Sequence, residues 1–388
     1  MNFSLNEDQL AFQAVAREFT KKELEPYVAQ WEEKKYFPKT TIRKAADRGF
    51  CGLHLKENKG GIACTRLDAT LILEELAVAC PSIAAYISVH NMTIWMIDTF
   101  GNEELWGKFV PKMTQGEWLG SYCLTEPGSG SDAASLKTTA QKKGNKWILN
   151  GTKAFVSGAG ETEVLVVMAR TGEHKTKGIS SFIVPAESKG ISYGKNERKM
   201  GWNTQPTRIV NLDTVEIPLE NILGKEGEGF KIAMRGLNVG RINIGTCSVG
   251  AGRAALQHSQ KYMKEREQFG KTLSHFQALR FKIADMATHI TASRQMIRLA
   301  ASKLDQKDPK SHIYCAMAKK FATDMCFEVC NEALQIFGGY GYIQDYPVEK
   351  LMRDTRVHQI LEGTNEIMKV IISRAVLEEN ILIYTDLV

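Results

Sequence analysis

The stretch that decides the fold is residues 230–265, FKIAMRGLNVGRINIGTCSVGAGRAALQHSQKYMKE. Its apolar residues recur with helical periodicity over the whole length, which predicts one very long helix. Two more segments of this kind follow, Phe276–Leu304 and Pro309–Phe337, and a shorter run after Thr364 has the same period. Long helices joined by short connections are typical of an up-and-down bundle, so residues 229–388 are predicted to form a four-helix bundle domain.

The residues before this bundle, 118–228, have the pattern of a β-domain. Short segments rich in β-branched and aromatic residues alternate with turns, and Asn150-Gly151 between two of them predicts a hairpin. No helical pattern separates these segments, so a parallel, doubly wound sheet is disfavoured. An antiparallel barrel or sandwich is predicted instead.

Residues 1–117 have helical periodicity. Ser4-Leu5-Asn6-Glu7 predicts a capping box that starts an amphipathic helix, and Asn102 is predicted to cap a later one. The predicted fold class is therefore α+β and mostly α. It consists of an all-helical N-terminal domain (1–117), a middle β-domain (118–228) and the helical bundle (229–388).

The composition is that of a globular protein with a large core. The chain has 388 residues, 43% hydrophobic and 24% charged, with a formal net charge of +6. Basic clusters with interleaved aromatics are absent, so nucleic acid is not an expected partner, and no apolar run reaches membrane-spanning length. The eight cysteines include no Cys-x-x-Cys pair. Buried free thiols in a reducing compartment are expected, without a metal site.

Glu362 is the first candidate for a catalytic residue. It lies in Leu361-Glu362-Gly363-Thr364, just ahead of a helical run that Thr364 or Asn365 can cap. A turn in this place can aim one carboxylate into a cleft while its backbone N–H groups point the same way. The alternative is a solvated carboxylate stabilised by the helix dipole, and a short motif alone does not decide between the two.

Other stretches have residues suited to binding a phosphate or a flavin. Residues 125–132, TEPGSGSD, form a turn rich in glycine and hydroxyl groups, but no helix opens after it inside a βαβ unit, so it is not the dinucleotide fingerprint. Residues 266–270 and 335–341 fall at bundle connections, where a charged loop and a helix C-cap are the plain alternatives. Arg241, within a long apolar helix, needs either an ion pair or a bound anion.

Together, these stretches resemble the acyl-CoA dehydrogenase family over essentially the whole chain. Residues 122–132, YCLTEPGSGSD, are similar to the family's first signature, and residues 335–354, QIFGGYGYIQDYPVEKLMRD, to its second. Glu362-Gly363-Thr364 matches the segment that holds the catalytic base. Within the family, residues 85–92, 201–208 and 358–363 look most like members that act on isobutyryl-CoA.

The resemblance implies an FAD enzyme that oxidises a short branched acyl-CoA between its α and β carbons. The expected reaction converts isobutyryl-CoA to methacrylyl-CoA in valine catabolism and passes the electrons to electron-transferring flavoprotein. Members similar to this chain are homotetramers. The expected location is the mitochondrial matrix if the source is eukaryotic, with a transit peptide removed before this numbering begins, and otherwise the cytoplasm.

By position, the resemblance assigns Glu362 as the catalytic base. Within one subunit, the residues expected to bind FAD are Tyr122, Cys123, Leu124, Thr125, Gly130, Ser131, Phe155, Val156, Ser157, Thr364 and Glu366. The residues expected to reach the FAD of a neighbouring subunit are Arg266, Phe269, Phe276, Gln277, Gln335, Ile336, Gly338 and Gly339. The residues expected to contact the acyl-CoA are Ser131, Asn238, Val239, Gly240, Arg241 and Arg374.

The chemistry explains why such groups are needed. The α proton of a thioester is a very weak acid, so in the family a backbone N–H at the Glu362 position and a flavin hydroxyl hold the carbonyl oxygen as enolate charge develops. One such donor is typically worth about 3 kcal/mol. Some relatives supply the base from the first bundle helix, but the corresponding position here is Gly240, which favours Glu362.

Several alternatives stay open at this point. Residues 346–350 and 62–64 depart from the isobutyryl-type pattern, so 2-methylbutyryl-CoA and butyryl-CoA are alternative substrates. An acyl-CoA oxidase would have an extra C-terminal helical domain, and a nitroalkane-oxidising relative would have Asp in place of Glu362. A non-catalytic helical scaffold that binds CoA would be expected to lack Glu362 or Arg266.

Overall fold

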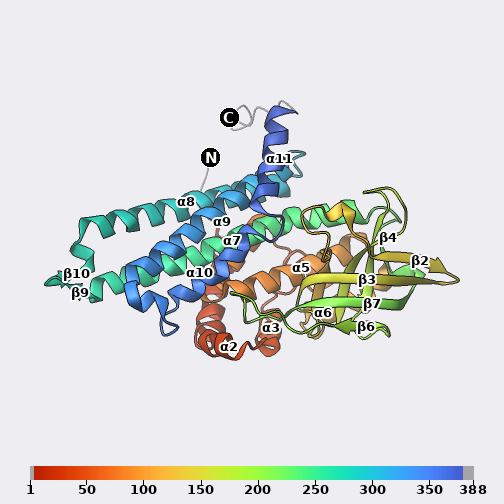
Figure 1. Cartoon of the computed structure of the whole chain (residues 1–388), viewed down its shortest axis with the longest axis horizontal. Helices are drawn as coiled ribbons and strands as arrows, with labels where there is room; N and C mark the ends of the chain where they lie inside the picture. Colours follow the sequence, from red (N-terminus) through yellow and green to blue (C-terminus); the bar gives the residue numbers. More distant parts are fainter. Residues whose placement is uncertain (1–3, 379–388) are drawn as a thin grey trace.

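The computed structural model describes residues 4–378, so the outermost parts of the predicted terminal domains, 1–3 and 379–388, lie outside the described residues. A helical region, a β-sheet region and a second helical region follow one another along the chain (Figure 1). The predicted fold class is confirmed. The division at residues 117 and 228 stays a prediction, although the change from helix to strand and back occurs near both positions.

The N-terminal region is helical, as predicted. Its helices are α1 (Glu7–Phe19), α2 (Val28–Lys34), α3 (Lys39–Ala46), α4 (Arg66–Ala79), α5 (Pro81–Phe100) and α6 (Glu103–Thr114). The capping box predicted at Ser4 is instead formed by Asn6 and Gln9, because the first helical residue is Glu7. Asn102 caps α6 by accepting from the N–H of Leu105 at 2.8 Å, as predicted.

The middle region is one eight-stranded sheet with the strand order β6-β7-β3-β2-β4-β5-β8, and β1 pairs with β4. Its strands are β1 (Gly120–Cys123), β2 (Thr139–Lys143), β3 (Lys146–Ser157), β4 (Val164–Arg170), β5 (Ile179–Pro185), β6 (Ile191–Tyr193), β7 (Thr207–Pro218) and β8 (Ile222–Leu223). Most neighbours are antiparallel, as predicted, but β1 and β2 both pair with β4 in parallel. About 40 residues separate β1 from β4, which is long enough for the crossover that a parallel pair requires.

The hairpin predicted at Asn150-Gly151 is wrong. Both residues lie inside the continuous strand β3, where its pairing with β7 shifts register, and the hairpin turn precedes β3 because Lys143 faces Lys146. The Asn150 side chain accepts from the N–H of Thr214 at 2.8 Å across this bulge. A Cβ on Gly151 would lie 2.4 Å from Thr138 Oγ1, so this glycine allows a close approach of two chain segments instead of a turn.

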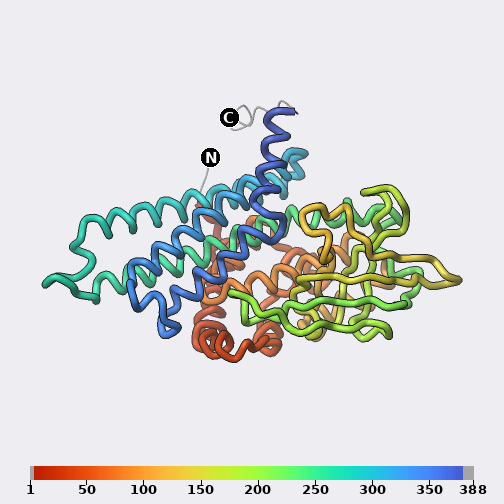
Figure 2. Tube along the Cα trace, in the orientation of Figure 1, coloured from red at the N-terminus to blue at the C-terminus, as the bar shows by residue number. Residues whose placement is uncertain are grey.

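The C-terminal region contains the long helices α7 (Gly229–Glu265), α8 (Gln277–Asp305) and α9 (Ser311–Phe337), followed by α10 (Val348–Arg356) and α11 (Asn365–Leu377). The chain traced in Figure 2 follows α7 from beside the sheet to the far end of the bundle. A short hairpin of β9 (Glu267–Gln268) and β10 (Lys271–Thr272) forms that end. The predicted fourth helix, α11, packs against α9 and points away from the long bundle axis (Figure 1).

Buried charges join the N-terminal helices to the bundle. Glu75 on α4 pairs with Arg17 at 2.9 Å and with Arg253 of α7 at 2.5 Å. The neighbouring Glu74 pairs with Arg253 at 2.8 Å and with Arg294 of α8 at 2.9 Å. Because each of these carboxylates contacts more than one guanidinium group, α4 is held in a fixed position on α7 and α8.

No helix within residues 4–378 combines the length and the apolar character that a membrane span requires.

Candidate active site

The predicted catalytic residue lies in a constrained turn between a short 3-10 segment, Val357–Gln359, and α11. Glu362 has φ of 56° and Gly363 has φ of 88°, so two successive residues adopt the left-handed conformation. Such a conformation costs a residue with a side chain on the order of 1 kcal/mol and persists only where the surroundings impose it. Thr364 caps α11 by accepting from the N–H of Ile367 at 3.3 Å, one of the two caps that were predicted.

The carboxyl group of Glu362 points at the backbone of α7. A Cβ built on Gly240 would lie 2.2 Å from Glu362 Oε2 and 3.3 Å from Oε1, so only glycine leaves room for this carboxyl group. Among residues 4–378, Oε2 is a buried oxygen without a hydrogen-bond partner. Burial raises the pKa of Glu362 to about 7, and the positive charges of Arg241 and Lys319 oppose that rise.

Residues 238–241 of α7 form the wall opposite this turn. Arg241 is 5% exposed and donates to Asn238 Oδ1 at 2.8 Å and, more weakly, to the carbonyl oxygen of Glu362 at 3.4 Å. Val239 and Gly240 are buried between these contacts. Within the described part of the chain, no carboxylate lies within ion-pair distance of Arg241, so of the two predicted alternatives the bound anion is the one left open.

Two segments predicted to bind the cofactor come together beside Glu362. The N–H of Ala154 donates to the carbonyl oxygen of Thr125 at 2.8 Å, which places the end of β3 against residues 122–125. The Tyr122 hydroxyl is buried without a hydrogen-bond partner in residues 4–378. Burial raises the pKa of Tyr122 well above its usual value, and the charge of Glu362 raises it further.

Phe155 is the most exposed residue of this pair of segments. It has φ of 55° at the second register shift of β3, and its ring is 69% exposed, whereas Val156 and Cys123 beside it are buried. A left-handed backbone at a bulge is unusual for an aromatic residue, and a bulge can redirect a side chain away from the sheet. The Phe155 side chain therefore lies outside the core, and its contact with FAD stays a prediction.

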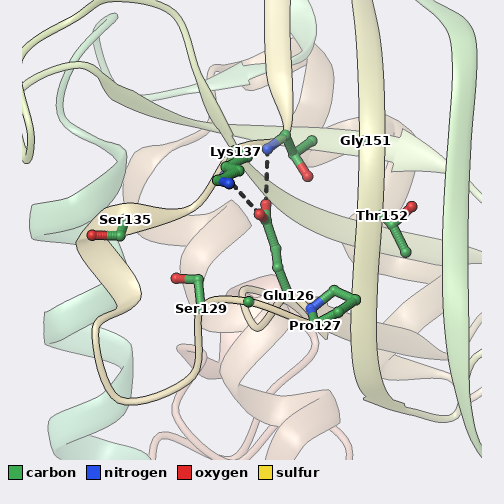
Figure 3. Close-up of a pocket in the computed structure, with 9 residues that line it drawn as sticks. Glu126, Pro127, Ser129, Ser135, Lys137, Gly151 and Thr152 are labelled. Atoms are coloured by element: carbon green, nitrogen blue, oxygen red, sulfur yellow. Dashed lines mark hydrogen bonds between the residues drawn. The ribbon is translucent and has the colours of Figure 1, made fainter.

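The turn 125–132 forms one wall of a cavity of about 280 Å³, shown in Figure 3. The Glu126 carboxylate accepts from the N–H groups of Lys137 at 2.6 Å and Thr138 at 2.9 Å. Lys153 also donates to it, at 2.8 Å. Glu126 is thus fully occupied in holding the turn. Gly130 and Ser131, the residues predicted to bind ligand here, are exposed.

A second group of predicted residues lies at the far end of the bundle, near β9 and β10. The Arg266 guanidinium lies 5.5 Å from the centre of the Tyr340 ring, which brings the β9–β10 end and the end of α9 together. Phe269 is 92% exposed, and a Cβ on Gly338 or Gly339 would meet no atom within 4 Å. The other predicted residues here are Phe276, Gln277, Gln335 and Ile336, of which Ile336 is buried.

These two groups do not meet within one chain. Gly240 and Arg266 are 26 residues apart on and just after α7, or about 39 Å along a helix. Glu366 and Arg374, also predicted, are exposed on α11, and Arg374 pairs with Glu378 at 3.5 Å. Arg374 lies about 15 Å along the helix from Thr364, so the structure does not bring it to the Glu362 turn.

Lys319, a residue that binds the backbone of the Glu362 turn, was not predicted from the sequence. Lys319 of α9 has no exposed surface and donates to the carbonyl oxygen of Gly363 and to Asn365 Oδ1, both at 2.8 Å. The available signal was a lysine at helical spacing from the apolar residues Cys315, Ala322 and Cys326, which places it on the apolar side of α9. In residues 4–378, no group of His, Cys, Asp or Glu side chains is arranged to hold a metal ion, and all eight cysteines are buried free thiols.

Sequence models of the acyl-CoA dehydrogenase N-terminal, middle and C-terminal domains match residues 6–117, 121–215 and 227–377. Isobutyryl-CoA dehydrogenase, mitochondrial, from Dictyostelium discoideum is 52% identical over 95% of this chain and 89% of its own length. The protein of the same name from Bos taurus is 50% identical over 97% of this chain and 91% of its own length.

Solved structures have the same fold. A chain in a structure described as electron transferring flavoprotein of Acidaminococcus fermentans has a TM-score of 0.95 and 42% identity, covering 97% of this chain and all of that one. Butyryl-CoA dehydrogenase from Megasphaera elsdenii has a TM-score of 0.94 and 38% identity over 97% of this chain and 100% of its own. PigA with FAD and proline has a TM-score of 0.94 and 26% identity over 97% of this chain and 99% of its own.

The chain therefore belongs to the acyl-CoA dehydrogenase family. It is an FAD-dependent oxidoreductase that acts on the CH–CH bond of an acyl-CoA. The residues present fit these ligands. Glu362 Oε2 in the turn and Tyr122 Oη in β1 are buried polar atoms without hydrogen-bond partners in residues 4–378, and β3 supplies the exposed Phe155 side chain.

Proposed function

We propose that this enzyme dehydrogenates a short branched acyl-CoA, isobutyryl-CoA, to methacrylyl-CoA in valine catabolism. The two mitochondrial relatives of that name, each matching at least 95% of this chain, support the choice of substrate. The observation on which the mechanism depends is the Glu362 carboxyl group, which is buried against Gly240 and has an oxygen without a partner in residues 4–378.

Glu362 acts as the base that removes the α proton of the thioester. Its raised pKa, about 7, makes the carboxylate a stronger base than an exposed glutamate while leaving a large fraction ionised near neutral pH. The backbone N–H of Glu362 would hold the thioester oxygen as negative charge develops. Arg241 and Asn238 form the opposite wall and would orient the acyl chain.

Tyr122–Thr125, Phe155–Ser157 and Thr364 would hold the cofactor beside Glu362. Two groups there are available to contact FAD. The buried Tyr122 hydroxyl has no hydrogen-bond partner in residues 4–378, and the Phe155 side chain is exposed. When bound, FAD supplies the acceptor for the hydride that leaves the β carbon. Bound acyl-CoA would exclude water from the base.

The bundle end with Arg266, Phe269 and Gly338–Gly339 would complete the FAD site of a second copy in a homotetramer. It lies too far along α7 to serve the Glu362 site of its own chain, and it exposes aromatic rings. Electron-transferring flavoprotein would accept the electrons, a proposal supported by the description of one matching structure. The proposed location is the mitochondrial matrix if the source is eukaryotic and otherwise the cytoplasm.

The assembly proposal predicts that Phe269→Asp weakens the tetramer and lowers the FAD content together. A charge in an apolar contact costs several kcal/mol of association free energy unless it is paired. Sedimentation and flavin absorbance measure the two quantities on the same sample. Tyr36→Asp, which changes an exposed aromatic of the N-terminal region, is the control and should leave both unchanged. A tetrameric Phe269→Asp protein with full FAD would contradict the proposal.

The catalytic proposal is tested with Glu362→Gln, which keeps the size of the side chain and removes its basicity. The variant should bind FAD and acyl-CoA normally and lose at least about three decades in kcat, since a general base typically contributes about 10² to 10⁴. Turnover is measured with electron-transferring flavoprotein as acceptor. A rate similar to that of the unmodified enzyme would assign the base elsewhere.

The substrate is tested by comparing kcat/KM for isobutyryl-, 2-methylbutyryl-, isovaleryl- and butyryl-CoA. The similarity to butyryl-CoA dehydrogenase makes butyryl-CoA a second candidate. Isobutyryl-CoA should give the highest value. If the straight-chain substrate gives a higher value, the reaction class stands and the branched-chain assignment is wrong.

A further inference from the structure

Lys319 is a buried ammonium group, and among residues 4–378 no carboxylate forms an ion pair with it. Its side chain has no exposed surface, and its hydrogen bonds go to neutral oxygens, Gly363 O and Asn365 Oδ1. In the part of the chain that the structure describes, no carboxylate oxygen lies within 4.0 Å of its Nζ atom. A buried charge of this kind is costly, and a methionine would fill the same space without that cost.

The lysine contacts the turn at the residue that follows Glu362. Gly363 has a left-handed φ, and the Lys319 ammonium binds the carbonyl oxygen of that residue. Asn365, the other acceptor, also donates to Thr323 Oγ1 at 2.9 Å and to Asp324 Oδ1 at 2.6 Å, both on α9. Gly363 and Asn365, at the end of the turn, are thereby both attached to α9.

We propose that Lys319 is a positioning residue for catalysis, which fixes the Glu362 turn and supplies the positive charge that favours the carboxylate form of Glu362. The inference depends on the proposed role of Glu362 as the base. A purely structural lysine would need only the hydrogen bonds. An electrostatic role needs the charge itself, and the two roles can be separated by experiment.

Glu362 and Lys319 both have a pKa near neutral pH. Burial raises the pKa of Glu362 to about 7 and lowers the pKa of Lys319 to about 7, and each charge favours the other. Arg241 of α7 stays charged and opposes the charge on Lys319, whereas Asp324 and Glu366 favour it. His358 stays neutral, since burial and the charge of Lys319 lower its pKa to about 3, and burial raises the pKa of the Cys315 thiol to about 12.

The sign of the effect follows from these contacts. Below about pH 7 Lys319 is protonated and holds Glu362 ionised to a lower pH than burial alone would allow. Without that charge, the pKa of Glu362 rises, so the acid limb of the rate profile moves to higher pH.

The test is the pH dependence of kcat/KM for the FAD-loaded tetramer of Lys319→Gln, Lys319→Met and Lys319→Arg. Gln keeps one hydrogen-bond donor and removes the charge, Met removes both, and Arg keeps the charge. The Gln and Met variants should move the acid limb up by about one pH unit, which is a loss of about tenfold at low pH that recovers at high pH. The Arg variant should move it by less than half as much.

Lys231→Met is the control, because Lys231 is an exposed lysine in the first turn of α7 and is not part of the contacts that hold the Glu362 turn. It should leave the profile unchanged. Flavin absorbance and thermal unfolding verify that each variant is folded, and the milder Gln variant decides the question if the Met variant does not fold.

Two outcomes overturn the inference. A uniform loss of kcat/KM at every pH would show a structural role only, and an unchanged profile in Lys319→Gln would show no role. If Glu362→Gln itself keeps full turnover, the proposed base is wrong instead, so the two failures are distinguishable.

Discussion

At the scale of single residues, the reactivity of this enzyme depends on a glycine as much as on an acid. Glu362 keeps its carboxyl group against α7 only because Gly240 has no side chain. The same absence removes any base from that helix position. The two positions therefore have to be considered together: a carboxylate at 362 requires a glycine at 240 in this geometry.

Gly240→Ala tests that dependence. Ala has a better helix propensity than Gly by about 1 kcal/mol, so the fold should tolerate the change. The new Cβ would lie 2.2 Å from Glu362 Oε2, which must move. Because a displacement of about 1 Å can cost 10²-fold, kcat should fall about 100-fold while FAD stays bound.

The control is Gly107→Ala on α6, where a Cβ would meet no atom within 4 Å. That variant should keep its activity and gain a little stability. Normal turnover in Gly240→Ala would mean that the carboxyl group can work from another position.

At the scale of elements, the end of β3 and the turn 125–132 depend on one buried ion pair. Lys153 on β3 is fully buried and donates to Glu126 Oε1 at 2.8 Å and to the carbonyl oxygen of Leu124 at 3.1 Å. The carboxylate in turn binds the backbone ahead of β2. Through these bonds the signature turn is attached to two strands.

Lys153→Met should therefore destabilise the enzyme by about 3 to 5 kcal/mol, because it leaves the Glu126 carboxylate buried without its cation. Thermal and urea unfolding measure the change. Lys146→Met is the control on the same strand. Its pair with Glu216, at 2.6 Å, is half exposed and should contribute less than about 1 kcal/mol. Equal effects of the two variants would contradict the assignment of the buried pair.

At the scale of the whole molecule, His358 joins the middle region to the C-terminal region. Its Nε2 accepts from the Trp202 indole N–H at 3.2 Å, and its Nδ1 lies 2.7 Å from Ser248 Oγ on α7. His90 has a similar place between α6 and β1, where Nε2 lies 2.9 Å from Met113 O and Nδ1 accepts from the N–H of Gly120. Both are buried histidines whose ring nitrogens have hydrogen-bond partners.

Because His358 and His90 are buried, the folded protein is predicted to lose stability in acid. Burial lowers the pKa of His358 to about 3 and that of His90 to about 4, against 6.5 for an ordinary histidine. Between these values the unfolded chain binds protons that the folded chain does not, so stability is present above pH 6.5 and is lost as the pH falls. Each histidine should lower the free energy of unfolding by roughly 2 kcal/mol at about pH 5, relative to its value above pH 6.5.

His358→Asn should remove part of this dependence. Unfolding midpoints of the variant and the unmodified enzyme, measured at about pH 8 and about pH 5, give the comparison. His174→Asn, which changes an exposed histidine, should leave the slope unchanged. The same slope in His358→Asn would mean that other groups cause the acid sensitivity.

The sequence by itself determined the long helices, the β-rich middle region, the cap at Thr364 and the place of Glu362 ahead of α11. These features depend on local periodicity and on residues a few positions apart, and such patterns can be recognised directly in a sequence. Only the tertiary structure decided that β3 runs through Asn150-Gly151, that Glu362 meets Gly240, and that Lys319 supports the turn. Register, burial and the pKa of a buried group depend on contacts between residues far apart in the chain, and spacing along the chain does not contain that information.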